Sequence, residues 1–386
     1  MFSASTFSNV VPEVISEIEI INTIKKGYGY NKYPSPDGNI KLILEFQNFL
    51  KNNFKVSIES EKITVCNGAM QAIDSISSII QGDVVFIMDS TVTFAKELPM
   101  LNGAEIVLVN TNHGIIDFKD LKYKLEIYKN RNIKYFYINY PNNPTGAQLS
   151  EIEFKNLIDI ALKNNLLIVH DHDICFVSYK KQKPIISIFN IKRAQETAIE
   201  IFTFSKEFGL SGLRVGLIVG NKDIIDMIKF HNYERNIMIP KLNQKLACIA
   251  LKKFNKNEII KNISQSMKTL INEFEKLGWK NIIKPHAGIS FLLEVPKKFI
   301  DAFGKNSGEL FAFFLISEYG IGVGPAIVNN RNLQNYIRIL SMENSKKCSK
   351  VFSTIKNEIS PDMEVPKELY KKYIKILSIT DTNYIR

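Results

Sequence analysis

The stretch that decides the fold is residues 203–216, TFSKEFGLSGLRVG. It follows an apolar run at 200–204 that predicts a buried strand, and it leads into a second apolar run at 215–219. A lysine placed directly after a strand of a parallel sheet lies at the carboxyl edge, where open α/β sheets bind their ligands. Lys206, followed by a glycine-rich turn and Arg214, is therefore a candidate functional residue, although a lone lysine is more often a solvated surface group.

Short apolar runs of the same kind recur through the middle of the chain. They predict seven strands, at 62–66, 84–88, 105–109, 135–139, 166–170, 200–204 and 215–219. Helical spacing between the runs predicts covering helices, at 42–52, 70–80, 118–129 and 150–163. Most of the strand candidates are apolar on both faces, which is typical of a largely parallel sheet with helices on both sides.

The pattern changes after residue 220. Long amphipathic helices are predicted at 222–254 and 258–277, and the second of them connects to the C-terminal part of the chain. Two strands and an intervening helix are then predicted, at 290–294, 336–340 and 307–318. We therefore predict the α/β class, with a three-layer α/β/α domain around a mostly parallel seven-stranded sheet and a smaller α+β domain.

The predicted domain boundaries depend on this change of pattern. The large domain is expected at 40–260. The small domain is expected at 261–386 and includes the N-terminal segment 1–39. No internal repeat or low-complexity linker separates the two parts, so we expect them to pack closely.

Composition excludes several classes of protein. The 386 residues are 45% hydrophobic and 23% charged, as in an ordinary globular protein. The charge of +11 is spread along the chain, without the basic stripe that nucleic-acid binding requires. Four scattered cysteines without CxxC spacing indicate a reducing compartment. No signal peptide or membrane-spanning run is apparent, so we predict a cytoplasmic protein with neither nucleic acid nor membrane as partner.

Residues 170–173, HDHD, raise the possibility of a metal site. Alternation along a strand sends His170 and His172 to one face and Asp171 and Asp173 to the other. No further cluster of histidine and acidic residues at ligand spacing accompanies them. We therefore predict no metal site.

Two more segments place polar or small residues where a predicted strand ends. Residues 139–146, NYPNNPTG, form a turn rich in proline and glycine. Residues 64–71, TVCNGAMQ, lead from a strand into a helix. A helix N-terminus with small residues offers unpaired N–H groups to an anion, so an anion site is expected at 68–70.

These segments resemble the motifs of the class I and II aminotransferases, which use pyridoxal 5'-phosphate on the fold type I scaffold of the aspartate aminotransferase superfamily. Residues 203–216 resemble S-x-S-K-x-x-G-L-x-G-x-R-x-G, residues 139–146 resemble N-P-x-N-P-T-G, and residues 64–71 resemble T-x-G-A-x-Q-A. The resemblance implies an enzyme of amino acid metabolism that moves an amino group between an amino acid and a 2-oxo acid. It implies a Schiff base between Lys206 and the cofactor.

The resemblance also implies which residues hold the cofactor. Asp171 would keep the pyridine nitrogen protonated, so that the ring accepts electrons from the substrate's α-carbon. Asn143 would bind the phenolic oxygen. The phosphate would be held by residues at the helix start and after the last parallel strand, namely Gly68, Ala69, Met70, Thr203, Ser205 and Arg214.

Substrate and subunit contacts are implied in the same way. Residues 336–341, YIRILS, resemble the family segment whose arginine binds the substrate's α-carboxylate, and Asn143 would lie beside it. The planar guanidinium of Arg338 matches a carboxylate with two parallel hydrogen bonds. Tyr33, in YPSPDG at 33–38, matches a family tyrosine that reaches the phosphate of the neighbouring subunit. A homodimer with shared active sites is therefore expected.

The sequence departs from the family at two positions. Ile174 stands where a tyrosine usually bonds the phenolic oxygen, and Thr91 stands where an aromatic ring usually stacks on the cofactor. Two alternatives therefore stay open. One is other pyridoxal-phosphate chemistry on an amino acid, as in a decarboxylase, lyase, cyclase or oxidase. The other is a non-catalytic effector-binding protein, which the retained Lys206 disfavours.

Overall fold

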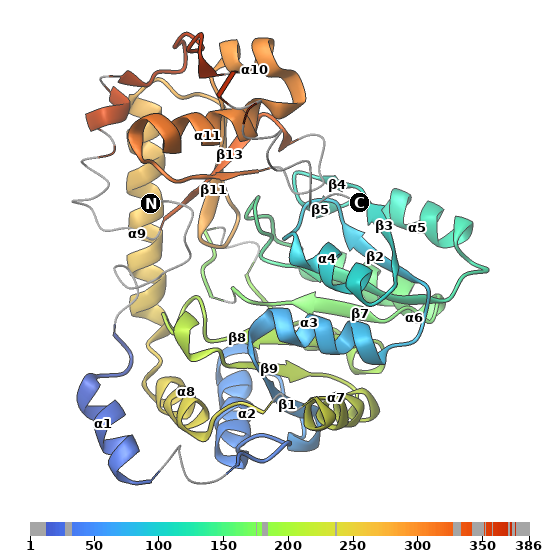
Figure 1. The fold of residues 1–386 in the computed structure, drawn as a ribbon. Helices are drawn as coiled ribbons and strands as arrows, with labels where there is room; N and C mark the ends of the chain where they lie inside the picture. The colour runs from blue at the N-terminus through green and yellow to red at the C-terminus, as the bar shows by residue number, and fades with distance from the viewer. Residues whose placement is uncertain are drawn as a thin grey trace.

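The computed structural model describes residues 13–27, 33–174, 176–179, 184–235, 238–326, 333–341, 351, 353–356, 358–369, 371–372 and 375. It contains two bodies, a large one around a central sheet and a smaller one beyond it (Figure 1). Among the helices of these residues, none has the length and apolar character needed to cross a membrane. Cys66 and Cys248 are buried free thiols, whereas Cys175 and Cys348 lie outside the described residues.

The large body is built on a seven-stranded sheet. Its strands, in spatial order, are β1 (Ile63–Cys66), β9 (Gly216–Val219), β8 (Ala198–Thr203), β7 (Ile168–Asp171), β6 (Ile133–Asn139), β2 (Val84–Met88) and β3 (Glu105–Val109). Only β9 runs against the others. The predicted α/β class and mostly parallel sheet are therefore confirmed.

Helices cover both faces of this sheet. On one face lie α2 (Ile40–Phe54), α5 (Phe118–Ile127), α6 (Glu151–Lys163) and α8 (Lys241–Lys253). On the other lie α3 (Gly68–Ile79), α4 (Phe94–Leu101) and α7 (Lys222–Glu234). Strand β2 shows why two covered faces need apolar residues throughout: Phe86 packs into the first layer and Val85 into the second. A short hairpin, β4 (Thr111–Asn112) and β5 (Ile115–Ile116), follows β3.

The single helix predicted at 222–254 is wrong. The structure has two helices there, α7 ending at Glu234 and α8 beginning at Lys241. Pro240 precedes α8 as its N-cap residue, with ψ of 139°. Proline has no backbone N–H for a continuing helix and disfavours the helical conformation in the residue before it. The amphipathic spacing on either side concealed this break.

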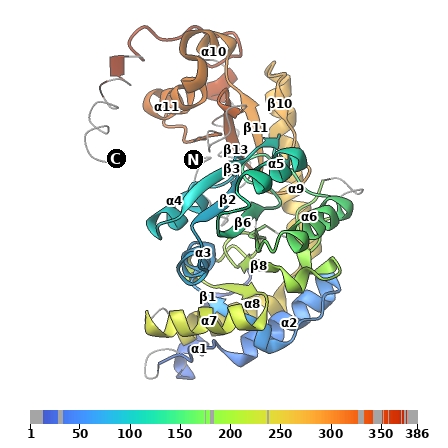
Figure 2. The same ribbon diagram turned by 90° about the vertical axis from the view of Figure 1, so that its right-hand side faces the viewer.

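The smaller body holds a four-stranded antiparallel sheet. Its order is β10 (Ile282–Ile283), β11 (Ser290–Glu294), β13 (Tyr336–Leu340) and β12 (Gly324–Pro325). Figure 2 shows α10 (Lys297–Phe303) and α11 (Ser307–Tyr319) at this end, and α1 (Glu17–Lys25) at the opposite end of the molecule. The 21-residue helix α9 (Lys256–Lys276) runs alongside both bodies (Figure 1). The numerical domain boundaries stay a prediction.

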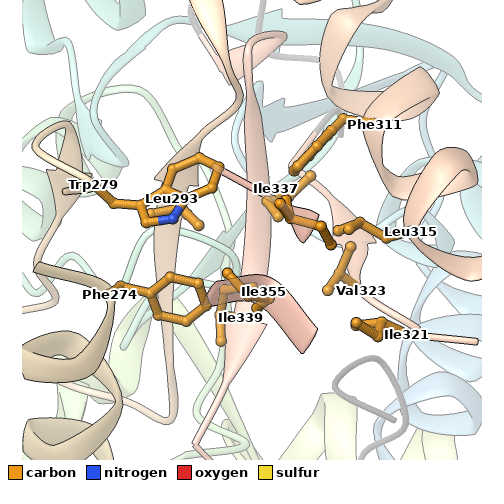
Figure 3. A pocket seen from close by; sticks show the side chains of 11 residues that line it. Phe274, Trp279, Leu293, Phe311, Leu315, Ile321, Val323, Ile337, Ile339 and Ile355 are labelled. Atoms are coloured by element: carbon orange, nitrogen blue, oxygen red, sulfur yellow. The ribbon is translucent and has the colours of Figure 1, made fainter. Parts of the chain in front are cut away.

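An apolar core holds the smaller sheet against α9 and α11. Phe274 and Trp279 from one side and Phe311 from the other line a cavity of about 20 Å³ (Figure 3). That volume is roughly one water-sized sphere, so the core is close to fully packed. The small sheet is thereby a firm support for the residues that its strand β13 presents to the large body.

Candidate active site

Three neighbouring strands of the large sheet end at the same edge. Asn139 is the last residue of β6 and pairs with Asp171, the last residue of β7, while Asp171 pairs with Ile201 on β8. The amide Nδ2 of Asn139 donates to the carbonyl of Asp171 (3.0 Å), and its Oδ1 accepts from the backbone N–H of Asn143 (2.8 Å). The strands β6, β7 and β8 run parallel, so residues far apart in sequence meet at their carboxyl ends.

Asp171 lies buried at this edge, with only 2% of its surface exposed. The hydroxyl of Tyr137 donates to its Oδ2 at 2.6 Å. Its other oxygen, Oδ1, is buried and has no hydrogen-bond partner among the described residues. Burial, reinforced by the negative charge of Asp173, raises the pKa of the Asp171 carboxyl to about 7. A buried acceptor in this condition is suited to a donor that comes from a ligand.

Lys206 lies three residues beyond the end of β8. Its Nζ is 3.9 Å from Oδ2 of Asp173. The hydroxyl of Thr203, the last residue of β8, donates to Oδ1 of Asp173 and accepts from the backbone N–H of Ser205 (3.2 Å). The lysine is thus placed within one group of polar side chains at the sheet edge.

The start of α3 approaches Arg214 closely. Gly68, the first residue of α3, has φ +76°, and a Cβ there would come within 2.7 Å of Nη2 of Arg214. The same Nη2 donates to the carbonyl of Asn67 at 3.4 Å. The side chain of Asn67 does not cap the helix, so the first N–H groups of α3 have no side-chain cap, and the helix starts beside a guanidinium. This is an anion-binding arrangement, and Ala69 and the half-exposed Met70 continue its first turn.

Arg338 brings the smaller body to the same site. It lies on β13, and its Nη1 donates to Oδ1 of Asn143 at 2.7 Å. Its Nε is buried without a hydrogen-bond partner among the described residues, and burial lowers the pKa of the guanidinium. Gly324 on β12 leaves room for it, since a Cβ there would lie 3.2 Å from Nη2. An arginine with an unused donor is suited to a second, anionic partner.

The sequence analysis also named Thr91, Tyr33 and Ile174, and each of them has a different environment. Thr91, just after β2, is fully buried. Tyr33 is 86% exposed and makes no hydrogen bond with the other candidates in the part of the chain that the structure describes. Ile174 packs with apolar residues such as Val177 and Ile263, so it contributes no polar group to the site.

Sequence reasoning missed two residues of this region, and Tyr137 is the first. It lies two residues before Asn139 on β6, and alternation would have placed both on one face of the sheet. Its pairing with Asp171 joins residues 34 apart in sequence. Burial, followed by the charge of Asp171, raises the pKa of Tyr137, so its hydroxyl stays a hydrogen-bond donor.

Glu200 is the second missed residue, and it lies behind the site on β8. Its Oε1 accepts from Nδ1 of His170 (3.0 Å) and Nδ1 of His172 (2.9 Å), and also from the backbone N–H of Ile188 (3.0 Å). The hydroxyl of Ser187 donates to Oε2. Against the cost of burial, the two histidines lower the pKa of Glu200 to about 2. The predicted alternation is confirmed, since the two imidazole rings stack with centroids 4.9 Å apart.

His170 lies between two hydrogen-bond acceptors of this network. Nε2 of His170 lies 3.0 Å from the carbonyl oxygen of Tyr140, and its Nδ1 faces Glu200. Both ring nitrogens of His170 therefore face hydrogen-bond acceptors. The ligand atoms of His170, His172 and Glu200 lie within 4.8 Å of one another, as in a metal site. Because hydrogen bonds already engage both oxygens of Glu200, we interpret the cluster as a buried hydrogen-bond network.

Comparison with known proteins places these observations in a family. The sequence model described as "Aminotransferase class I and II" matches residues 3–348. An LL-diaminopimelate aminotransferase of Natranaerobius thermophilus is 28% identical over 320 residues, covering 80% of this chain and 78% of the relative. An L-glutamine--4-(methylsulfanyl)-2-oxobutanoate aminotransferase of Bacillus subtilis is 24% identical and covers 80% and 76%.

Solved structures agree on the fold. An aminotransferase from Staphylococcus aureus superposes with a TM-score of 0.78 at 23% identity, covering 90% of this chain and 91% of that one. Substrate-bound BacF of Bacillus subtilis gives a TM-score of 0.82 at 19% identity, with coverage of 94% and 91%. At this level of identity the superpositions show the fold alone, and it is the fold predicted from the sequence.

Proposed function

The chain belongs to the class I and II aminotransferase family, and from that premise we propose that it transfers amino groups with pyridoxal 5'-phosphate held on Lys206. Transamination itself, between an amino acid and a 2-oxo acid, is the activity of the family and of the named relatives. The identity of the cofactor in this chain and the role of each site residue are the proposal.

The observation that carries the proposal is the unpartnered oxygen of Asp171. A buried carboxylate oxygen without a donor is costly, and a protonated pyridine nitrogen is a donor that would satisfy it. Tyr137 fixes the other oxygen and so directs Oδ1. When bound, the cofactor supplies an electron sink for the pair of electrons left at the substrate's α-carbon. Asp171 would maintain that capacity by keeping the nitrogen protonated.

The cradle at Gly68 fits the phosphate of the same cofactor. The N–H groups at the start of α3, which lack a side-chain cap, and the guanidinium of Arg214 both favour an anion. We assign Gly68, Ala69 and Met70 to this end of the site, with the hydroxyls of Thr203 and Ser205 beside them. Asn143 and Thr91 are assigned to the ring between the two ends.

Lys206 and Arg338 would act on the substrate. The buried Nε of Arg338 has no hydrogen-bond partner among the described residues, so the guanidinium would bind the substrate's α-carboxylate. Its Nη1 would keep the hydrogen bond to Asn143. The proton to be moved is the hydrogen on the substrate's α-carbon. Lys206 would take that proton from the α-carbon and return it during transfer of the amino group.

We also propose a homodimer with shared sites. Tyr33 is 86% exposed, and further large apolar side chains are exposed near it in sequence, among them Ile18, Ile21, Ile40 and Leu44. Exposed apolar groups of this size are typical of an interaction surface. Burying them against a second copy would place Tyr33 where it could reach the partner's cofactor phosphate.

A direct experiment tests the function. The purified protein, loaded with pyridoxal 5'-phosphate, is incubated with a panel of amino acids and one 2-oxo acid, and the new amino acid is measured. The panel includes LL-diaminopimelate and glutamine, because relatives carry those names. Amino transfer from at least one donor is expected, and a Lys206→Ala variant should be inactive. Release of carbon dioxide or ammonia without amino transfer would contradict the proposal.

A further inference from the structure

The hydroxyl of Tyr137 lies beside the carboxylate on which the proposed function depends. Tyr137 pairs with Val169 on β7, and Asp171 lies two residues farther along that strand. Alternation places all three side chains on one face of the sheet, so the tyrosine reaches the acid diagonally across two neighbouring strands. Its hydroxyl donates to Oδ2 of Asp171 at 2.6 Å, a length typical of an O–H group that donates to a charged carboxylate.

A second tyrosine on the same strand shows that burial alone does not require this contact. Tyr135 lies two residues before Tyr137, on the same face, and both side chains are fully buried. The hydroxyl of Tyr135 shares a hydrogen bond of 2.7 Å with Ser77 on α3 rather than with an acid of the site. The two tyrosines fill the same apolar layer, and they differ in the group that each hydroxyl bonds.

The hydroxyl of Tyr137 keeps its own proton. Burial, followed by the charge of Asp171, raises the pKa of Tyr137 well above its usual range. Burial and then the charge of Asp173 raise the pKa of the Asp171 carboxyl to about 7, and the hydrogen bond from Tyr137 is the largest influence that lowers it. The phenol thus acts as a fixed donor, and the acid is less basic than it would be without that donor.

The oxygen that Tyr137 does not reach is the one left for a ligand. Oδ1 of Asp171 is buried without a hydrogen-bond partner among the described residues. In the loaded protein, one proton would lie between this oxygen and the ring nitrogen of the cofactor. A hydrogen bond accepted at Oδ2 makes Oδ1 a weaker base, so the proton would rest on the nitrogen. Without that hydrogen bond, the buried acid would compete for the same proton more strongly.

We propose that Tyr137 is a positioning residue that acts through Asp171 and determines where the shared proton rests. By holding Oδ2, its hydroxyl keeps Oδ1 directed at the ring nitrogen and keeps the proton on that nitrogen. This role rests on the proposed function, because it requires pyridoxal 5'-phosphate beside Asp171. Tyr137 itself contacts neither the cofactor nor the substrate in this assignment.

The test compares Tyr137→Phe with Tyr135→Phe. Each variant loses one buried hydroxyl from the same face of β6, so the second variant is a matched control for the structural cost of that loss. Each protein is loaded with pyridoxal 5'-phosphate that is isotope-labelled at the ring nitrogen, and the chemical shift of that nitrogen is read by NMR at neutral pH. The shift differs between a protonated and a neutral pyridine nitrogen, and its measurement requires no turnover. The other charged or titratable groups around the acid are unchanged in both variants, namely Asp173, His170, Cys66, Lys206 and Arg214.

The parent and Tyr135→Phe should show a protonated ring nitrogen. In Tyr137→Phe, the ratio of nitrogen-bound to carboxyl-bound proton should fall by about 10- to 100-fold, the usual contribution of a hydrogen bond to a charged group, so the shift should move toward the neutral value. An unchanged shift in Tyr137→Phe, or the same change in Tyr135→Phe, would overturn the inference. Amino transfer by the parent would persist in both cases and would leave the proposed function intact. A parent that binds no cofactor would overturn both.

A crystal structure of the loaded parent is a second test, and it needs no variant should Tyr137→Phe fail to fold. The hydroxyl of Tyr137 should remain within hydrogen-bond distance of Oδ2 of Asp171, with Oδ1 facing the ring nitrogen. A tyrosine hydroxyl bonded to another group, or a carboxylate with both oxygens turned away from it, would refute the role.

Discussion

Replacing Asp171 by asparagine should make the cofactor-free protein more stable at neutral and alkaline pH while it removes most of the activity. The carboxyl is almost fully buried, and its Oδ2 accepts from Tyr137. Its second oxygen has no donor among the described residues. A buried charge with an unpartnered oxygen destabilises the folded protein until a ligand supplies the missing donor. An amide of the same shape carries no charge and can still accept from Tyr137.

The size of the effect can be worked out from proton linkage. Burial and the charge of Asp173 raise the pKa of Asp171 from 3.8 to about 7. The folded protein therefore holds this proton more tightly than the unfolded chain. The contribution to stability is complete below about pH 4 and is lost as the pH rises through about 7. A difference of about 3 pH units corresponds to about 4 kcal/mol, which is an upper bound because the site can relax.

The assay is thermal unfolding of cofactor-free parent and Asp171→Asn at about pH 4 and about pH 8, with Asp301→Asn, an exposed change on α10, as the control. The variant should unfold at a higher temperature than the parent at the alkaline pH, and the difference should shrink or vanish at the acidic pH. Turnover of the loaded variant should fall by orders of magnitude, since an amide cannot hold the pyridine proton. A variant that is less stable than the parent at the alkaline pH would refute the reasoning.

Three further predictions concern other parts of the site. Arg338→Ala should weaken amino-acid binding by about 2–5 kcal/mol without altering the visible spectrum; equal damage to binding of decarboxylated amines would show a structural role instead. Gly68→Ala should raise the dissociation constant of the cofactor, because Gly68 has φ +76° and an added Cβ would displace the guanidinium of Arg214. Unchanged binding in a fluorescence titration would count against the phosphate site at Gly68. Glu200→Gln should lower the free energy of unfolding by about 1–3 kcal/mol, because an amide cannot accept all the hydrogen bonds that reach the Glu200 carboxylate; an unchanged denaturation midpoint would contradict this role of Glu200.

The local pattern of apolar residues was sufficient to predict the strands of the large sheet. The predicted strands at 84–88 and 105–109 coincide with β2 and β3, and the other five differ from the observed strands by at most two residues at an end. A strand covered on both faces is an uninterrupted apolar run, so its limits are visible in the sequence itself. The break near Pro240 escaped because amphipathic spacing continues on both sides of it.

Contacts between distant segments could not be predicted in the same way. The motif around Lys206 pointed to the carboxyl edge of the sheet, and the structure places Asp173 and Thr203 there with it. The partners Tyr137 and Glu200 are joined to the site by pairings across neighbouring strands. Such pairings depend on strand order and register, which one sequence does not specify. The alternation that placed His170 opposite Asp171 needed only the strand itself.

The measurement that tests the central claim most directly is a peptide mass spectrum of the protein after incubation with pyridoxal 5'-phosphate and reduction with borohydride. Reduction fixes the cofactor to the amine that holds it. We expect one dominant adduct, on Lys206, which is lost in Lys206→Ala. An adduct on a different lysine, or none on a protein that transfers amino groups, would contradict the claim.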